Sequence, residues 1–311
     1  MVFGYGLKDI GGCGLFNILE MIGQLLINSL VVGSIYALMA LAMSIIYKAS
    51  EIPNFGQGEM AMICTYITFV LLHSYSLPFS VALIGTLIFA FLLGVLFEFI
   101  FIRRAKEPNL LGFIIITLGF QMILYGFAGW KWGSDQRTFS LPFSESEVIL
   151  RNDAFVLTEH NLASIIIAIV IMVCLYLLLQ YSKLGLAMKA CQQNVKAAKF
   201  NGIPTNRILG ISFGFSAIVG AIAGILVAPI STLDPTMMWD PLLKGFAAAV
   251  LGGMKSLPGV VVGGLLLGLI ENLFGFYISL EFKSVVAFAI IILVLFIKPS
   301  GLFEKHYVRK V

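Results

Sequence analysis

Nine apolar stretches follow one another between residues 19 and 298, and each is bounded by charged residues or prolines. A helix crosses the hydrocarbon core of a bilayer with about 20 apolar residues. Charged side chains make up 12% of the sequence, against about a quarter in soluble domains, so polar residues are too few to cover a particle in water. The pattern predicts an all-α integral membrane protein, a polytopic helical bundle of about 8 to 10 transmembrane helices.

We expect a single transmembrane domain over residues 1–311, with the stretches at residues 19–47, 56–74, 79–102, 110–130, 162–181, 209–230, 242–254, 259–278 and 284–298. The first stretch is long enough to contain a break near Gly33, and the seventh is short enough to be a re-entrant half-helix. A transmembrane β-barrel is excluded, because its strands alternate apolar and polar residues whereas residues 79–102 are apolar on every side.

The distribution of Lys and Arg orients the bundle, because short loops rich in these residues stay in the cytoplasm. The segment 182–208 contains Lys and Arg but no acidic residue, and further basic clusters lie at 103–106 and after residue 297. The segments 131–161 and 231–241 are acidic and are expected outside. With nine crossings, the N-terminus lies outside and the C-terminus inside.

A short helix closed by Gly202 and Pro204 is predicted within the segment 182–208. The order Lys196-Ala197-Ala198, three residues, then Gly202 resembles the cytoplasmic coupling loop of ABC importer permeases, Glu-Ala-Ala-x-x-x-Gly, which docks into the ATPase subunit. Lys196 replaces the Glu of that pattern, so the resemblance implies a docking surface of small residues without the usual acidic side chain. The alternative interpretation is an ordinary basic cytoplasmic loop.

Further motifs, in the same order along the chain, resemble the branched-chain amino acid permeases of the LivH type. They cover residues 21–304 and comprise Asn28-Ser29-Leu30, residues 33–38, Asn54-Phe55-Gly56-Gln57-Gly58-Glu59, Arg103-Arg104, Thr117-Leu118-Gly119, residues 244–253, Leu257-Pro258-Gly259 and residues 298–303. Gly56-Gln57 replaces the usual Ala-His of that family, which leaves the cargo within the family open.

The resemblance implies the multi-pass permease subunit of an ATP-binding cassette importer in a prokaryotic inner membrane. Its implied cargo is leucine, isoleucine, valine or a similar small amino acid. Its implied partners are a second permease in a heterodimer, two cytoplasmic ATPase subunits and an extracytoplasmic solute-binding protein. ATP and Mg belong to the ATPases, and no cofactor is expected on this chain.

Polar residues in or beside the apolar stretches are candidates for the translocation path, since such side chains face a bundle interior or a wet cavity. Gln24 and Asn28 lie four residues apart, hence on one helix face, and Thr117 and Gln121 repeat that spacing. The alternative role is hydrogen bonding between helices. The candidates are Gln24, Asn28, Tyr36, Asn54, Gln57, Glu59, Thr117 and Gln121.

Two other acidic residues lie in the apolar stretches. Glu98 is close to Arg103 in sequence and is predicted to form a structural ion pair with it. Glu271 receives no role from the sequence.

Glycines at four-residue spacings, with further glycines along the same stretches, predict close packing of helix backbones. They lie in two of the stretches, as Gly210, Gly214, Gly220 and Gly224, and as Gly259, Gly263, Gly264 and Gly268. These seams lie either within the bundle or between two permease subunits, and the sequence leaves both open.

No catalytic residue and no metal site are expected. Residues 252–256, Gly-Gly-Met-Lys-Ser, differ from a phosphate-binding loop because Met254 separates glycine from lysine. The three histidines are dispersed, and the four cysteines are interpreted as small apolar side chains. The rival functions are a secondary transporter driven by an ion gradient, which uses membrane-embedded acidic residues or broken helices, and a passive channel.

Overall fold

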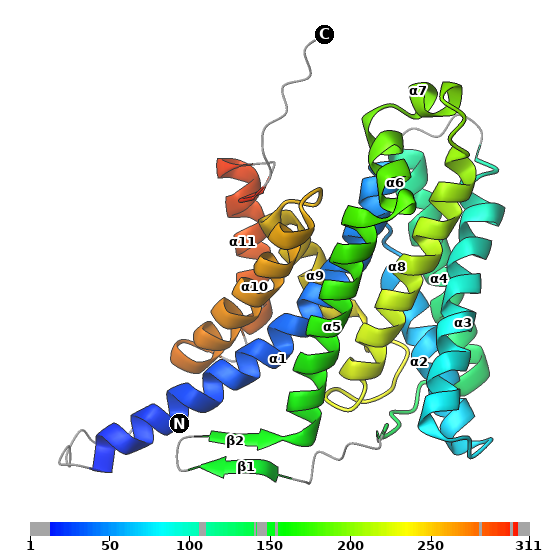
Figure 1. Ribbon diagram of the computed structural model, residues 1–311. Helices are drawn as coiled ribbons and strands as arrows, with labels where there is room; N and C mark the ends of the chain where they lie inside the picture. The colour runs from blue at the N-terminus through cyan, green and yellow to red at the C-terminus, as the bar shows by residue number, and fades with distance from the viewer. Residues whose placement is uncertain are drawn as a thin grey trace.

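The computed structural model describes residues 13–105, 110–139, 141, 148–152, 155–279, 282–298 and 301–303. Each of the nine apolar stretches is found as a helix (Figure 1). These helices are α1 (Cys13–Ser50), α2 (Gln57–His73), α3 (Phe79–Phe97) continued by the π-helical η1 (Glu98–Ile102), α4 (Leu110–Trp132), α5 (Glu159–Tyr181), α8 (Thr205–Val227), α9 (Trp239–Gly252), α10 (Leu257–Tyr277) and α11 (Lys283–Ile297).

Six helices in the described part of the chain are long and apolar enough to cross a membrane: α1, α3 with η1, α4, α5, α8 and α10. The helices α2, α9 and α11 have 17, 14 and 15 residues. A polytopic helical membrane protein, as predicted, is therefore confirmed.

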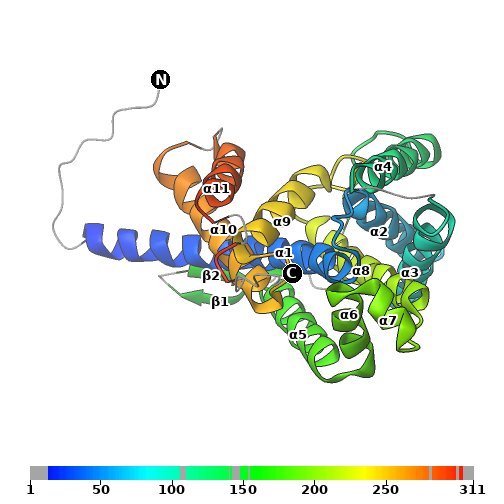
Figure 2. The same ribbon diagram turned by 90° about the horizontal axis from the view of Figure 1, so that it is seen from above.

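The helix α1 is continuous over 38 residues, so the break considered near Gly33 is absent. Its residues from Ile35 to Ile46 are buried at the centre of the bundle, where α1 packs against α5, α8, α9 and α10. Its first turns project beyond the other helices (Figure 2), while Ser29 and Leu30 still lie beside α10. Gly33 is needed for packing, because a Cβ there would lie 3.0 Å from the Cα of Leu265 in α10.

The eight glycines singled out in the sequence all face other helices of this chain. In α8, Gly210 and Gly214 face Glu98 and Phe91, while Gly220 and Gly224 face Gln57 and Thr65 of α2. In α10, Gly259 and Gly263 face α9, while Gly264 and Gly268 face Ala37 and Gly33 of α1. The seams therefore lie within this bundle.

Two short helices, α6 (Lys183–Gln193) and α7 (Val195–Phe200), stand at one end of the bundle where a single short helix was expected (Figure 1). Each begins at a capping side chain. Ser182 accepts a hydrogen bond from the Gly185 backbone N–H at 3.1 Å, and Asn194 accepts one from Ala197 at 3.0 Å. Such caps satisfy N–H groups that have no partner inside the helix. The helices α6 and α7 are called the docking helices below, after the role that the resemblance of residues 196–202 to a coupling loop implies.

The opposite end carries an antiparallel hairpin of β1 (Val148–Asn152) and β2 (Phe155–Thr158), a small β element beside the predicted helical bundle. Two short runs of aliphatic residues on either side of Asn152 and Asp153 suit a strand-turn-strand. The two acidic segments meet at this end as well, because Arg137 and Leu233 exchange backbone hydrogen bonds of 3.1 and 2.9 Å. Their predicted placement on one side of the membrane agrees with this contact.

Replacing Gly264 by leucine should destabilise the bundle, because even a Cβ there would lie 2.5 Å from the Cα of Ala37. Overpacking a core lowers the free energy of unfolding by about 1–3 kcal/mol. This variant should lie at the upper end of that range, because the atoms it meets belong to the backbone of α1. Gly126→Leu in α4 is the matched control, since no atom lies within 4 Å of that Cβ position. Unfolding in detergent by titration with SDS measures both, and equal stabilities would contradict the packing role.

Candidate functional site

A buried polar network joins α1, α2 and α8 beside the start of α2. The Gln57 amide donates a 2.9 Å hydrogen bond to the Ser216 carbonyl and accepts one of 3.0 Å from the Ser216 hydroxyl. The same hydroxyl lies 2.7 Å from the Ala42 carbonyl of α1. Asn54 lies 3.4 Å from the Gln57 side-chain oxygen, and both residues are fully buried. This network fixes the junction of the three helices.

Glu59 lies one half-turn further along α2 and faces α4. Its Oε1 accepts a 2.8 Å hydrogen bond from the side chain of Gln121, while its Oε2 is buried and has no hydrogen-bond partner within the described part of the chain. The Trp239 side chain at the start of α9 also interacts with this carboxyl group. The Trp239 ring packs on Tyr125 of α4 with centroids 5.5 Å apart. Glu59, Gln121, Tyr125 and Trp239 are called the Glu59 cluster below.

Thr117 is buried near Asn54 but is satisfied within its own helix, where its hydroxyl donates to the Ile114 carbonyl at 2.9 Å. Gly56 allows this approach, because a Cβ there would lie 3.2 Å from the Thr117 carbonyl oxygen and 3.4 Å from Oδ1 of Asn54. Five predicted path residues are thus brought together: Asn54, Gln57, Glu59, Thr117 and Gln121.

Gln24 and Asn28 do not join this group. They share a helix face as expected, with a 3.1 Å hydrogen bond from Gln24 to Asn28. The Gln24 side chain also accepts a 2.9 Å hydrogen bond from the Val156 N–H, so it ties α1 to β2. Gln24 is half-buried and Asn28 is exposed.

Tyr36 belongs to a second group, a buried ionic cluster that the sequence did not reveal. Lys244 lies 2.6 Å from Glu271 and 2.6 Å from Asp240, and Lys283 lies 3.7 Å from Glu271. The Lys244 ammonium also stands 5.5 Å from the centre of the Tyr36 ring. The available signal was the placement of Lys244 and Glu271 in apolar stretches, where ionised residues pair with one another.

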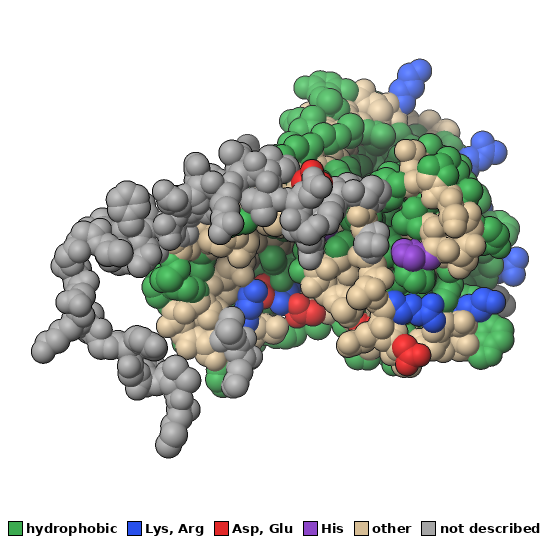
Figure 3. Space-filling view, turned by 90° about the horizontal axis from the view of Figure 1, so that it is seen from below, with side chains coloured by type: hydrophobic (Ala, Val, Ile, Leu, Met, Phe, Trp, Pro, Cys, Tyr) green, Lys and Arg blue, Asp and Glu red, His purple; other side chains and the backbone are tan. Residues whose placement is uncertain are grey.

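Exposure of the ionic cluster increases toward the end of the bundle opposite the docking helices. Glu271 is fully buried, Lys244 is 7% exposed and Asp240 is 57% exposed. Figure 3 shows basic and acidic side chains next to one another on this face. The cluster therefore extends from the interior of the bundle to its surface and joins α9, α10 and α11.

Glu98 and Arg103 form the predicted structural ion pair. Arg103 donates to both carboxylate oxygens, at 3.2 and 2.8 Å, and also to the Asn206 carbonyl at 3.2 Å. Bidentate pairing of this kind is strong and directional. It connects η1 to the start of α8, beneath the docking helices.

The predicted coupling residues lie on α7 and just after it. Lys196 and Ala197 are exposed, Ala198 is buried, and Gly202 is exposed with a φ of 78°. That left-handed backbone is easily adopted by glycine. The chain therefore presents one face of α7 outward and turns sharply into α8.

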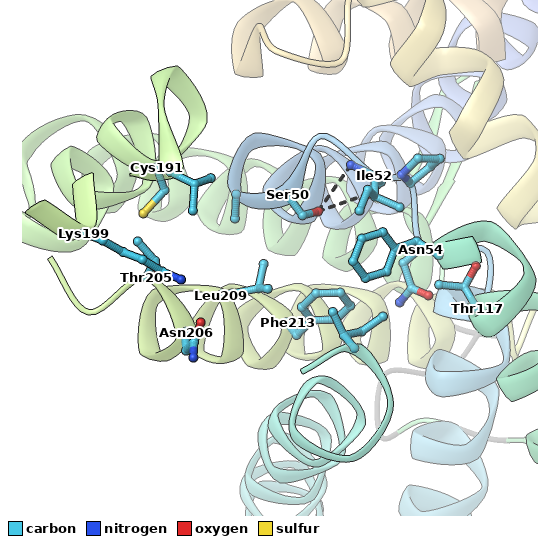
Figure 4. Close-up of a pocket in the computed structure, with 15 residues that line it drawn as sticks. Ser50, Ile52, Asn54, Thr117, Cys191, Lys199, Thr205, Asn206, Leu209 and Phe213 are labelled. Carbon is cyan, nitrogen blue, oxygen red and sulfur yellow. Dashed lines mark hydrogen bonds between the residues drawn. The ribbon is translucent and has the colours of Figure 1, made fainter. Parts of the chain in front are cut away.

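A pocket of about 180 Å³ lies between the docking helices and the rest of the bundle (Figure 4). Lys199 and Thr205 line one end, and Asn54 and Thr117 line the other, with Leu209 and Phe213 between them. The pocket therefore runs from α7 to two of the predicted path residues.

Three cysteines, Cys64, Cys174 and Cys191, are free thiols. Burial raises the pKa of the Cys191 thiol, which keeps it neutral. The described residues contain no group of three His, Cys, Asp or Glu side chains that could hold a metal ion.

Buried polar and ionic side chains inside a membrane helical bundle are typical of transport proteins, in which such residues mark substrate pathways. The chain belongs to the family described as branched-chain amino acid transport system / permease component, whose model matches residues 25–295. It is therefore a transport permease subunit, and the family predicted from the sequence motifs is confirmed.

Relatives agree with this membership. The chain is 31% identical to the high-affinity branched-chain amino acid transport system permease protein LivH of Escherichia coli K12, over 93% of this chain and 97% of that protein. It is also 31% identical to the permease protein BraD of Pseudomonas aeruginosa, with the same coverage. The structure of PsaBC from Streptococcus pneumoniae in complex with Fab has a similar fold, with a TM-score of 0.52, 12% identity and coverage of 93% and 97%.

Replacing Lys244 by methionine should cost about 3–5 kcal/mol of folding free energy, because the Glu271 carboxylate then stays buried with a poorer partner. Removing both charges, as Lys244→Met with Glu271→Leu, should recover most of this loss. Asp240→Asn is the control, and at its exposed site it should cost at most about 1 kcal/mol. Titration with SDS in detergent measures all three. A double variant as unstable as Lys244→Met would contradict the pairing argument.

Proposed function

We propose that this chain is the permease subunit of an ATP-binding cassette importer in a prokaryotic inner membrane, and that it forms the translocation path for branched-chain or similar small amino acids. The family match over residues 25–295 carries this proposal, because it spans nearly every helix of the bundle. The permeases LivH and BraD are named for branched-chain amino acid transport. As a transport subunit, the chain has no catalytic role in this proposal.

The proposed topology has nine membrane segments, of which α9 is a half-helix. The contact of Trp239 with Tyr125 places the start of α9 beside the middle of α4, and its 14 residues extend only about 21 Å. Half-helices of this kind line substrate sites in other transporters. The N-terminus and the hairpin then lie outside, and the docking helices lie in the cytoplasm, in agreement with the basic residues there.

The proposed energy source is ATP and Mg bound by two separate ATPase subunits that contact the docking helices. ATP binding brings the ATPases together, and their different affinities for the two states of the permease shift its population between outward- and inward-open forms. A solute-binding protein delivers the cargo at the hairpin end. The pocket between α7 and the bundle supports this arrangement, since it leaves room for the docking helices to move.

The proposed path runs along the surface formed by α2, α4 and α9, which a second, related permease closes. Trp239 and Leu243 of α9 and Leu118 and Met122 of α4 are exposed on this chain. The Glu59 cluster lies between these helices. Gln24 and Asn28 are assigned to the hairpin contact instead of the path.

Two of the three carboxylates buried in the described helices pair with basic side chains, Glu98 with Arg103 and Glu271 with Lys244. The alternative of a secondary transporter requires a membrane-embedded acidic residue that binds the coupling ion. Because Glu271 pairs with Lys244, it is poorly suited to that role.

Reconstitution into proteoliposomes tests the proposed function. With the ATPases, the second permease, leucine-loaded binding protein and ATP, leucine should accumulate against its gradient, and an ionophore should leave the rate unchanged because no ion gradient is used. Omitting the ATPases is the control and should abolish accumulation. Accumulation that persists without ATPases and collapses with an ionophore would reject the importer.

Replacing Gly202 by valine should uncouple ATP hydrolysis from uptake, because a β-branched residue resists the left-handed backbone at the end of the docking segment. Gly202→Asn is the matched control, since asparagine adopts this conformation readily. Space is not a factor, because no atom lies within 4 Å of the Cβ position. We expect at least about a threefold rise in ATP hydrolysed per leucine for valine only, consistent with strain of about 1 kcal/mol. Identical ratios for both variants would show that this turn does not transmit coupling.

A further inference from the structure

Glu59 differs from the other carboxylates buried in the described helices. It is 1% exposed, yet no Lys or Arg of the described residues forms an ion pair with it. Its Oε1 accepts a hydrogen bond from an uncharged amide, and its Oε2, like that of Glu271, has no hydrogen-bond partner among the described residues. A buried carboxylate oxygen without a donor is rare in folded proteins and calls for an explanation.

The depth of Glu59 in the bundle also sets it apart. Its partner Gln121 is the middle residue of α4, which runs from Leu110 to Trp132. The carboxyl group therefore lies near the midplane of the membrane, where substrate sites of alternating-access transporters are found. An ionised side chain at this depth is costly unless a charge of the opposite sign reaches it.

A pair of aromatic rings adjoins the carboxyl group through Trp239. Trp239 interacts with it directly and packs on Tyr125, with ring centroids 5.5 Å apart. Trp239 is 43% exposed, so the cluster reaches the open surface of the bundle through this side chain. Aromatic faces attract ammonium groups, most strongly where water is excluded. A carboxylate beside two such rings is a set of groups suited to a primary ammonium ion.

We propose that the Glu59 carboxylate receives the α-ammonium group of the amino acid as it crosses the midplane, with Trp239 and Tyr125 beside the cation. The inference rests on the proposed function, because it assigns part of the translocation path. The ammonium group supplies a donor to Oε2 and a charge that compensates the carboxylate. The cluster thereby favours amino acids over solutes of similar shape that lack a cationic group.

The closed position of Oε2 in this structure fits a site that opens during transport. Gln121 and Trp239 lie between the carboxyl group and the exposed surfaces of α4 and α9. A movement of α9 relative to α4 exposes the carboxylate to the path and then covers it again.

Glu59→Gln tests the charge with little change in shape. In proteoliposomes with saturating leucine-loaded binding protein, this variant should lower the maximal uptake rate about tenfold or more, the effect of losing one charge-assisted hydrogen bond. Thr68→Val is the control, since it removes another buried hydrogen bond of α2, to Thr86, without a change in charge. Its uptake rate should stay within about twofold of the unmodified protein.

The double exchange Glu59→Gln with Gln121→Glu separates the charge from the position. Because the two side chains are 2.8 Å apart, the exchange returns a carboxylate to within one hydrogen bond of its present place. Uptake should recover to at least about a third of the unmodified rate. Rates are normalised to the amount of assembled complex, so that a folding defect is counted separately.

The outcomes separate this inference from the proposed function. If the unmodified complex imports leucine with ATP and Glu59→Gln imports it equally fast, the ammonium site is rejected while the importer stands. If the exchange variant assembles but is as slow as Glu59→Gln, the carboxylate acts only in packing and the inference is rejected. If the unmodified complex imports nothing, the proposed function itself fails.

Discussion

Close approach of helix backbones is the condition on which the rest of this bundle depends. A membrane interior offers no water to drive apolar surfaces together, so helices associate through tight packing and internal hydrogen bonds. Gly33, Gly264 and Gly268 let α1 and α10 meet backbone to backbone, and glycines of α8 do the same for α2 and α3. The polar groups of α1, α2, α8 and α9 then reach one another at hydrogen-bond distance. Larger residues at these positions would hold the helices apart, and the buried polar groups would lie beyond hydrogen-bond distance of one another.

The buried polar groups are of two kinds: those that pair with a partner on another helix and stabilise the bundle, and those that lack a charged partner. Glu98 and Glu271 each meet a basic side chain, and Gln57 satisfies its amide between two helices. These groups connect helices that are distant in the sequence. Glu59 and Glu271 each have one carboxylate oxygen without a hydrogen-bond partner among the described residues, but Glu271 meets Lys244 and Glu59 meets no basic side chain in that part of the chain, so the missing counter-charge distinguishes Glu59.

The helices and their order could be predicted because hydrophobic length is a local property. Each apolar stretch became a helix, and the Glu98–Arg103 pair followed from proximity in the sequence. The ionic cluster around Lys244 could not be predicted, because Glu271 lies 27 residues away in the sequence and only the fold shows that the two side chains meet. The spacing of Gln24 and Asn28 correctly placed both on one face of α1. It could not reveal that Gln24 binds the backbone of β2.

The residue at position 57 has a consequence for how the junction of α1, α2 and α8 responds to acid. The related permeases usually carry an imidazole at this place, a group that gains a proton near neutral pH. Here the junction is built from Asn54, Gln57 and Ser216, and amides and hydroxyls do not change charge in the physiological range. The junction of these three helices therefore keeps its bonding pattern when the surrounding pH falls, because none of these side chains gains a proton there.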